Sequence, residues 1–183
     1  MTSILKVSEI QDPTNNNTAL TIDSAGRVFQ AAKPSFHAIL QANQSLSADT
    51  QTTLQVKAET FITAYNKARN TGSNVGGGFD DTTYKYTIPV TGRWVIYGQL
   101  GVYNNNNPSR FMEIQFSINN AVGDDLQFIG SHSDGTSYAD YDGVAGSRVL
   151  YLSAGDTVHL IGRTVLASTA MNGPTHLGGY LLG

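Results

Sequence analysis

The chain lacks cysteine altogether and is poor in charge. Without cysteine it can form no disulfide framework, no thiol nucleophile and no cysteine-ligated zinc site. Charged residues make up 14% of the 183, the net charge is −3, and no basic patch of the kind that binds nucleic acid is present. No apolar run approaches the roughly 18 residues of a membrane span. No secretory signal follows Met1, so we expect neither membrane insertion nor export by that route.

Glycine and tyrosine are abundant instead, with 19 and 9 residues, and threonine, asparagine and valine are frequent. This composition is typical of many short strands joined by tight turns. The length suits one ordinary domain with a short appendage. A surface wetted by neutral polar groups is common in extracellular and virion proteins.

The appendage is predicted at residues 1–33. Its apolar residues come in short clusters separated by the polar stretch "DPTNNN", and Ser24-Ala25-Gly26 reads as a hairpin turn. Such clusters bury too little to fold alone, so we expect an arm that lies on a partner. The expected contact residues are Ile4, Leu5, Val7, Leu20 and Ile22. Pro34 marks the boundary to a head domain over residues 34–183.

Several strands of the head are predicted from alternation of apolar and polar residues. They cover residues 36–40, then 84–88 with Tyr84, Tyr86 and Ile88 on one face, and 112–118. Ser153 to Asp156 is predicted to be the turn of a hairpin. The pattern at residues 54–66 fits a helix and a strand equally well.

The segment "RWVIYGQLGVY" is predicted to be a long strand with two unlike faces. Trp94, Ile96, Leu100 and Val102 form a core face by their period of two. The other face carries Val95, Tyr97, Gln99 and Tyr103. Two tyrosines and a glutamine among aliphatic residues are typical of a surface that meets another protein.

No catalytic constellation is evident. The "GGGFDD" segment lacks the Gly-Lys-Ser/Thr ending of a phosphate-binding loop, and no Gly-x-Ser-x-Gly elbow occurs. The four histidines, His37, His132, His159 and His176, show no metal-ligating spacing, and His159 is expected on the outer side of a strand. We therefore predict a protein that is not an enzyme and has no cofactor.

The alternative to a protein without a bound metal is one that binds calcium. Asp134, Asp140 and Asp142 gather in a glycine-rich segment, with Asp124 and Asp125 nearby. Carboxylate oxygens in a loop can hold Ca²⁺, which takes 6–8 oxygen ligands. The order of residues in an EF-hand is absent, so a solvated loop is the favoured interpretation.

Three segments carry a family resemblance. "FDDTTYKYTIPVTGRWVIYGQLGV" resembles the central signature of the globular head of complement component q and its tumour-necrosis-factor-like relatives. "SRVLYLSAGDTVHLIG" is similar to the penultimate hairpin of that family, and "HLGGYLLG" to its closing strand. The resemblance spans 34–183 and departs at Trp94, where the family prefers Tyr, and at Leu177, where it prefers Phe. The opening "SILKVSEIQD" is similar to N-terminal segments of bacteriophage virion proteins that carry such heads.

The resemblance implies an all-β jelly-roll sandwich with an extended N-terminal arm. Its last strand would lie in the middle of the inner sheet, which would explain the apolar end of the chain as core. The resemblance also favours a strand at residues 54–66. It implies a homotrimer. The face formed by Val95, Tyr97, Gln99 and Tyr103 supports a trimer independently, and we expect these residues at the interface.

The function expected from these observations is that of a structural protein on the outer surface of a phage virion. A capsid decoration or cement protein, whose arm binds other virion proteins, is favoured. The alternatives are a short tail or head fibre that binds a host glycan or protein, and a free-standing lectin-like binding module.

Overall fold

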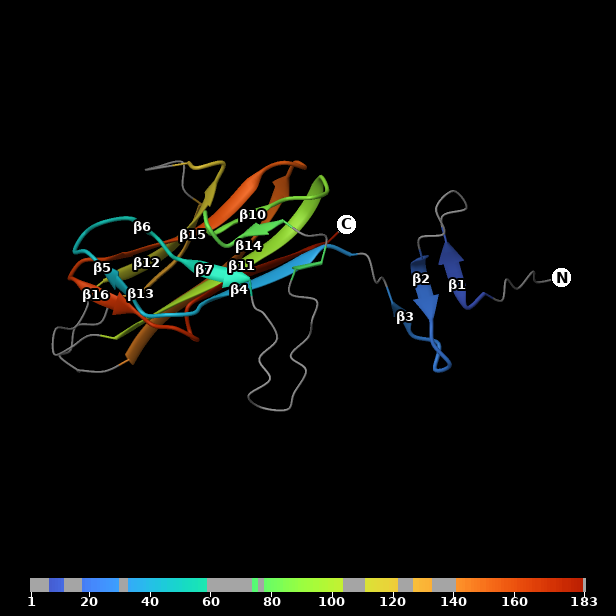
Figure 1. The fold of residues 1–183 in the computed structure, drawn as a ribbon, viewed down its shortest axis with the longest axis horizontal. Helices are drawn as coiled ribbons and strands as arrows, with labels where there is room; N and C mark the ends of the chain where they lie inside the picture. Colours follow the sequence, from blue (N-terminus) through green and yellow to red (C-terminus); the bar gives the residue numbers. More distant parts are fainter. Residues whose placement is uncertain are drawn as a thin grey trace. The chain divides into compact units, whose positions relative to one another are not determined.

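Every named element of the chain is a β-strand (Figure 1). The computed structural model describes residues 7–11, 18–29, 33–58, 74–75, 78–103, 111–121, 127–132 and 141–182. The chain divides into two units, Met1–Lys33 and Pro34–Gly183, which we call the arm and the head. Within the described ranges, no helix is long and apolar enough to cross a membrane.

The arm contains a three-stranded antiparallel sheet in the order β1-β2-β3. Its strands are β1 (Glu9–Gln11), β2 (Thr18–Ile22) and β3 (Val28–Phe29). The turn between β2 and β3 places Gly26 at φ 77°, and one carboxylate oxygen of Asp23 accepts the backbone N–H groups of Ala25 and Arg27, each at 2.9 Å. The hairpin predicted at this turn is confirmed. The backbone and side chain of Arg27 hold the pKa of Asp23 below its usual value.

The head is built from two sheets. The eight-stranded sheet runs β5-β16-β11-β17-β4-β7, with β14 also paired to β11 and β8 to β4. Its strands are β4 (Ser35–Leu40), β5 (Gln44–Leu46), β7 (Val56–Ala58), β8 (Asn74–Val75), β11 (Gly92–Tyr103), β14 (Tyr141–Leu152), β16 (Ser168–Ala170) and β17 (His176–Leu181).

The six-stranded sheet runs β13-β12-β15-β10-β9, with β6 also paired to β15. Its strands are β6 (Thr52–Thr53), β9 (Phe79–Asp80), β10 (Lys85–Thr87), β12 (Met112–Ile118), β13 (Gln127–His132) and β15 (Thr157–Thr164). The named strands of the head pair antiparallel, and the two sheets pack face to face around one core. The predicted jelly-roll sandwich is confirmed.

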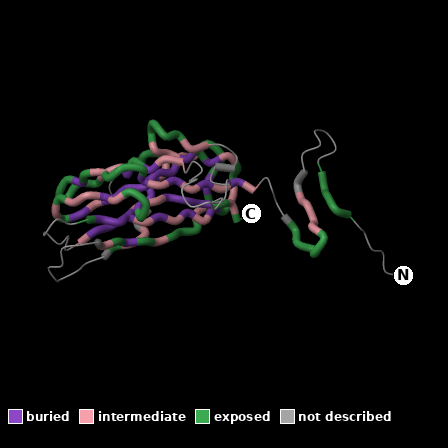
Figure 2. The backbone as a smooth tube through the Cα atoms, turned by 60° about the horizontal axis from the view of Figure 1, so that its bottom comes forward, coloured by how far each residue is buried: buried purple, intermediate pink, exposed green. Residues whose placement is uncertain are grey.

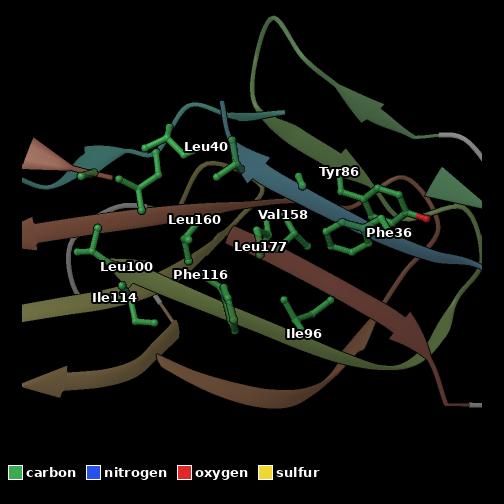
Figure 3. Close-up of a cluster of buried hydrophobic side chains, with 14 of the residues drawn as sticks. Phe36, Leu40, Tyr86, Ile96, Leu100, Ile114, Phe116, Val158, Leu160 and Leu177 are labelled. Atoms are coloured by element: carbon green, nitrogen blue, oxygen red, sulfur yellow. The ribbon is translucent and has the colours of Figure 1, made fainter. Parts of the chain in front are cut away.

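The core follows the predicted alternation. The side chains of Trp94, Ile96, Leu100 and Val102 on β11 are completely buried. Ile96 and Leu100 belong to the same core cluster as Phe116 of β12 and Leu160 of β15 (Figure 3). Gly98 interrupts this row because the opposite sheet comes close there: a Cβ at Gly98 would lie 2.9 Å from Leu160 Cδ1. Figure 2 shows the buried segments running through the interior of the head.

Aromatic rings fill one end of this core. Phe36 stacks on Tyr86 with ring centres 3.8 Å apart, and Tyr86 meets the edge of Trp94 at 5.9 Å. Trp94 also donates its indole N–H to the carbonyl of Val90 at 3.1 Å. Burial raises the pKa of Tyr86 to about 12, and its hydroxyl has no hydrogen-bond partner among the described residues.

The closing strand lies where the resemblance predicts, between β11 and β4 in the eight-stranded sheet. Only part of its apolar sequence is core, however. Leu177 is completely buried, whereas Tyr180 is 42% and Leu182 45% exposed. The expectation that the chain ends on apolar residues because they are core is therefore wrong for Tyr180 and Leu182, since the strand alternates and these two residues have the opposite parity.

Two further expectations need correction. The turn at Ser153 to Asp156 exists, but β14 pairs with β11 in one sheet and β15 pairs with β12 in the other. The turn therefore crosses between sheets and is not a hairpin. Tyr84 is not part of a strand: it precedes β10 in a turn, with φ 60°.

The undecided segment at 54–66 is resolved in part. Val56–Ala58 is strand β7, paired with β4, as the resemblance favours. Residues 59–66 lie outside the described residues.

Replacement of Trp94 by Ala is expected to lower the free energy of unfolding by about 3–5 kcal/mol, because it leaves a cavity beside Tyr86 at one end of the aromatic cluster. Trp94→Phe should cost less, since a ring remains and only the bond to the Val90 carbonyl is lost. Urea unfolding followed by circular dichroism measures both. An Ala variant as stable as the unmodified chain would contradict the assignment of Trp94 to the core.

Candidate functional site

The eight-stranded sheet has a second side that faces away from the core, which we call the open face. The register of β11 with β17 and β14 sets its composition. One row across the three strands is apolar, Tyr180–Val95–Val149. On one side of it lies the row Gly178–Tyr97–Ser147, followed by His176–Gln99–Ala145. On its other side Arg93 pairs with Tyr151. Apolar and polar rows therefore lie side by side.

Exposed apolar side chains concentrate on the open face. Val149 is 60% and Tyr151 72% exposed, and Tyr180, Leu182 and Tyr103 have the same parity on this sheet. Elsewhere on the head, the exposed large hydrophobic residues among those described are Val90 and Val165. A grouped apolar surface of this kind marks an interaction site more often than scattered exposed residues do.

The predicted interface residues all lie on this face. Val95, Tyr97 and Gln99 are half-buried within the head and Tyr103 is exposed, so the strand parity predicted for them is confirmed. The sequence analysis missed Val149 and Tyr151 on β14 and placed Tyr180 and Leu182 in the core. The alternation of "VLYL" could have placed Val149 and Tyr151 on the open face. Leu152 is buried and Leu150 packs against the core, so Val149 and Tyr151 point to the other side.

Two histidines and a tyrosine form a cluster on the open face. The ring of His37 on β4 lies 5.3 Å from that of His176 on β17, and each lies 6.2 Å from the ring of Tyr97. Gly178 makes room for this cluster, because a Cβ there would lie 2.3 Å from the Tyr97 ring. No sequence pattern indicates this cluster, since His37 and His176 are at opposite ends of the head sequence.

The solvent side of the six-stranded sheet is different, because it carries a network of ion pairs. Arg163 on β15 donates to Glu113 on β12 at 3.1 Å and forms a second ion pair with Asp49. Both carboxylates raise the pKa of Arg163 through these hydrogen bonds. This network ties the loop at Asp49 to the sheet and leaves no unpaired charge at that position.

His159 on β15 lies on the side opposite Val158 and Leu160, as predicted, but it is only 5% exposed. The predicted side of the strand is therefore confirmed, but the side chain of His159 is covered on that side. Its Nδ1 has no hydrogen-bond partner among the described residues. Burial, with a smaller contribution from Lys85, lowers the pKa of His159 from 6.5 to about 4.

The "GGGFDD" segment ends in a structural turn. One carboxylate oxygen of Asp80 accepts the backbone N–H of Thr82 at 2.8 Å, and the other accepts the hydroxyl of Thr83 at 2.8 Å. The hydrogen bonds from Thr82, and then that from Thr83, lower the pKa of Asp80 to about 2. Asp81 accepts the backbone N–H of Ala58 at 2.8 Å and so connects this turn to β7.

The aspartates considered for calcium fall almost entirely outside the described residues. This applies to Asp124, Asp125, Asp134 and Asp140, whereas Asp142 accepts the backbone N–H of Gly143 at 2.7 Å. Within the ranges that the structure describes, no three His, Asp or Glu side chains gather to hold a metal ion.

A pocket lies at the end of β11, beside the open face. It has a volume of about 520 Å³ and is lined by Asn43, Tyr103, Met171, Asn172 and Pro174. The side-chain oxygen of Asn43 accepts the backbone N–H of Asn172 at 3.0 Å, which fixes the two loops that form its wall. The pocket thus combines an exposed tyrosine with two amide side chains.

No buried residue occurs among those residues of the arm whose exposure is described. Each is half-buried or exposed, including the expected contact residues Val7, Leu20 and Ile22. Ile4 and Leu5 lie outside the described residues. Ile10 and Val28 are additional exposed apolar residues of the arm.

Comparison with known proteins identifies the fold. No protein-family model and no curated protein matches the chain. Among solved structures, it is similar to the Eiger TNF of S. frugiperda, with a TM-score of 0.50 and 13% sequence identity. The similarity covers 82% of this chain and 94% of that one. The head is therefore a jelly roll of the TNF-like type.

The buried His159 predicts how stability depends on pH. As the pH falls from about 6.5 to about 4, the unfolded chain gains a proton at this residue that the folded chain does not, so the folded state loses up to about 3 kcal/mol. The contribution is constant above pH 6.5.

Urea unfolding between pH 7.5 and 4 should show this loss, and His159→Gln should reduce it by the same amount. Identical pH profiles for the two proteins would contradict the neutral, buried state of His159.

Proposed function

We propose that this chain is a non-enzymatic structural protein of a bacteriophage particle. The heads form a homotrimer on the outer surface of the virion, and the arm attaches them to other virion proteins. The concentration of exposed apolar side chains on the open face carries the proposal. The assignment to a phage rests on the resemblance of the opening segment to virion proteins, and the absence of a nucleophile elbow supports a non-enzymatic role.

The open face supports self-association because solvating it is unfavourable. The apolar row on β17, β11 and β14 places a 42% exposed tyrosine and a 60% exposed valine beside Val95. Burying a side chain of this size fully is worth about 1.5–3 kcal/mol. A few such groups from each copy, surrounded by polar residues such as Gln99 and Ser147, match the usual anatomy of a protein interface.

The arm supports attachment because it cannot bury its own apolar residues. Isolated small sheets are marginally stable in water, and holding the backbone of each residue costs roughly 1–2 kcal/mol. Edge strands such as β1 and β3 can extend the sheet of a neighbouring protein, where backbone hydrogen bonds give affinity and alternate side chains give register. A virion partner would supply the missing surface.

Within this proposal we favour capsid decoration over a fibre. The sequence contains no shaft repeats, and the 33 residues of the arm, Met1–Lys33, span at most about 110 Å even when fully extended. A decoration protein needs no more than this to bind adjacent shell subunits. A fibre has to hold its head well away from the particle.

The pocket at Tyr103 favours the second candidate, a short fibre or a lectin-like module that binds a host glycan. Tyrosine offers an apolar ring with a polar tip, and the amides of Asn43 and Asn172 offer donors and acceptors for hydroxyl groups. A free-standing module of this kind would have no use for the arm.

The trimer predicts a mass of three times 19.6 kDa in size-exclusion chromatography with light scattering. Val149→Asp should give a folded monomer, because it places a charge in the apolar row while altering a residue that is 60% exposed in the head.

The matched control is Val165→Asp, the same change at a 40% exposed valine outside the open face, which should remain trimeric. A monomeric unmodified chain at micromolar concentration, or a trimeric Val149→Asp variant, would contradict the interface.

Removal of residues 1–33 tests the arm. A chain that starts at Pro34 should remain a folded trimer with nearly unchanged melting, since the core cluster lies entirely within the head. It should no longer bind to phage particles that lack the protein, whereas the full chain should bind. If the truncated chain binds equally well, the arm is not the anchor.

Phage particles that lack the protein also distinguish the two proposed roles, decoration and fibre. Particles without the protein that are fragile but still adsorb to cells indicate decoration, and sturdy particles that no longer adsorb indicate a fibre.

A further inference from the structure

His37 and His176 on the open face are spaced as two ligands of one metal ion would be. They lie on the adjacent strands β4 and β17, where His37 is opposite Gly178 and His176 opposite Ile39. Their ring centres are 5.3 Å apart. Two imidazoles bound to one tetrahedral ion, each through a nitrogen about 2.0–2.1 Å away, place their ring centres about 5 Å apart. The two rings therefore need little movement to share an ion.

The tautomer of His176 is fixed in the form that binds metals. Its Nδ1 lies 3.2 Å from the backbone carbonyl oxygen of Pro174. A carbonyl oxygen only accepts hydrogen bonds, so in the neutral ring Nδ1 carries the proton and Nε2 keeps its lone pair. Histidine ligands in metal sites nearly always donate their other ring N–H to a group of this kind.

The carbonyl that orients His176 is itself held in place. The next residue, Thr175, is completely buried, and its hydroxyl both accepts from the backbone N–H of Gly101 at 3.1 Å and donates to the Gly101 carbonyl at 3.2 Å. The Thr175 carbonyl in turn accepts the backbone N–H of Leu40 at 2.9 Å. These bonds join the turn before β17 to β11 and β4, so the carbonyl that orients His176 is held in place before any ion arrives.

Tyr97 lies beside the two histidines. Its ring lies over Gly178, with its centre 6.2 Å from the centre of each imidazole. The absence of a side chain at Gly178 keeps the space between β4 and β11 open for these three rings.

We propose that His37 and His176 bind a divalent transition-metal ion of the class that prefers imidazole nitrogen, such as Zn²⁺, with water in the remaining positions. The chain contributes two ligands, consistent with the absence of any group of three among the described residues. The site does not depend on the proposed trimer. Where the heads associate through the open face, however, the ion would lie inside that interface.

Isothermal titration of the EDTA-treated full chain with ZnCl₂ tests the site. One ion per chain should bind, and ZnCl₂ should raise the melting temperature. His37→Gln and His176→Gln should each lower the affinity for Zn²⁺ by at least roughly 10- to 100-fold. Loss of a residue that only orients a metal ligand already has an effect of this size. His159→Gln, which removes the buried histidine of the other sheet, should leave the affinity unchanged.

A second measurement uses the unmodified chain and does not depend on any variant folding. The electron paramagnetic resonance spectrum of the Cu²⁺-loaded chain should show coupling to two imidazole nitrogens. Absence of Zn²⁺ binding, binding unaffected by loss of both histidines, or a Cu²⁺ spectrum without imidazole nitrogen would each overturn the proposal. Light scattering of the same samples keeps the two proposals apart: a trimer without bound Zn²⁺ refutes the site alone, and a monomer with bound Zn²⁺ refutes the trimer alone.

Discussion

The pairing of β11 along its whole length is the constraint on which the rest of the head depends. On one edge it pairs with β14 over 12 residues, Gly92–Tyr103, and on the other with β17 and β16. Because its side chains alternate, this register fixes both surfaces of the sheet at once. A slip of one residue would send Trp94 and Ile96 to solvent and Val95 and Tyr97 into the core. The core and the open face are thus two consequences of one set of backbone hydrogen bonds.

Alternation made much of this predictable. The faces of β11, β4 and β12 follow from the sequence because each strand has a buried side and a more polar side. The end of the chain was harder, since "YLL" is apolar at every position and only the pairing with β11 shows that Tyr180 points outward. The turn at Ser153 has the residues of a hairpin, and nothing local reveals that its strands belong to different sheets.

The open face and the histidine cluster were less predictable than the core, because they combine residues from several strands. Val95, Tyr97, Gln99 and Tyr103 belong to a single strand, so one sequence pattern contains them. The histidine cluster joins β4 and β17, whose neighbourhood is decided by the sheet order and not by any spacing along the chain. The burial of His159 likewise depends on what packs over the six-stranded sheet, which its own strand does not encode.

In the proposed trimer, the two parts of the open face would contribute in different ways. Burial of the apolar row at Val95 would supply free energy of association but little orientation, because apolar contacts are not directional. The polar rows hold Tyr97, Gln99 and His176, whose hydrogen bonds require particular angles. Self-association that must satisfy both rows is limited to few rotations of one head against another. A symmetric oligomer with a single arrangement is what such a surface favours, and the arm, which contributes nothing to the head's core, is then available for a different partner.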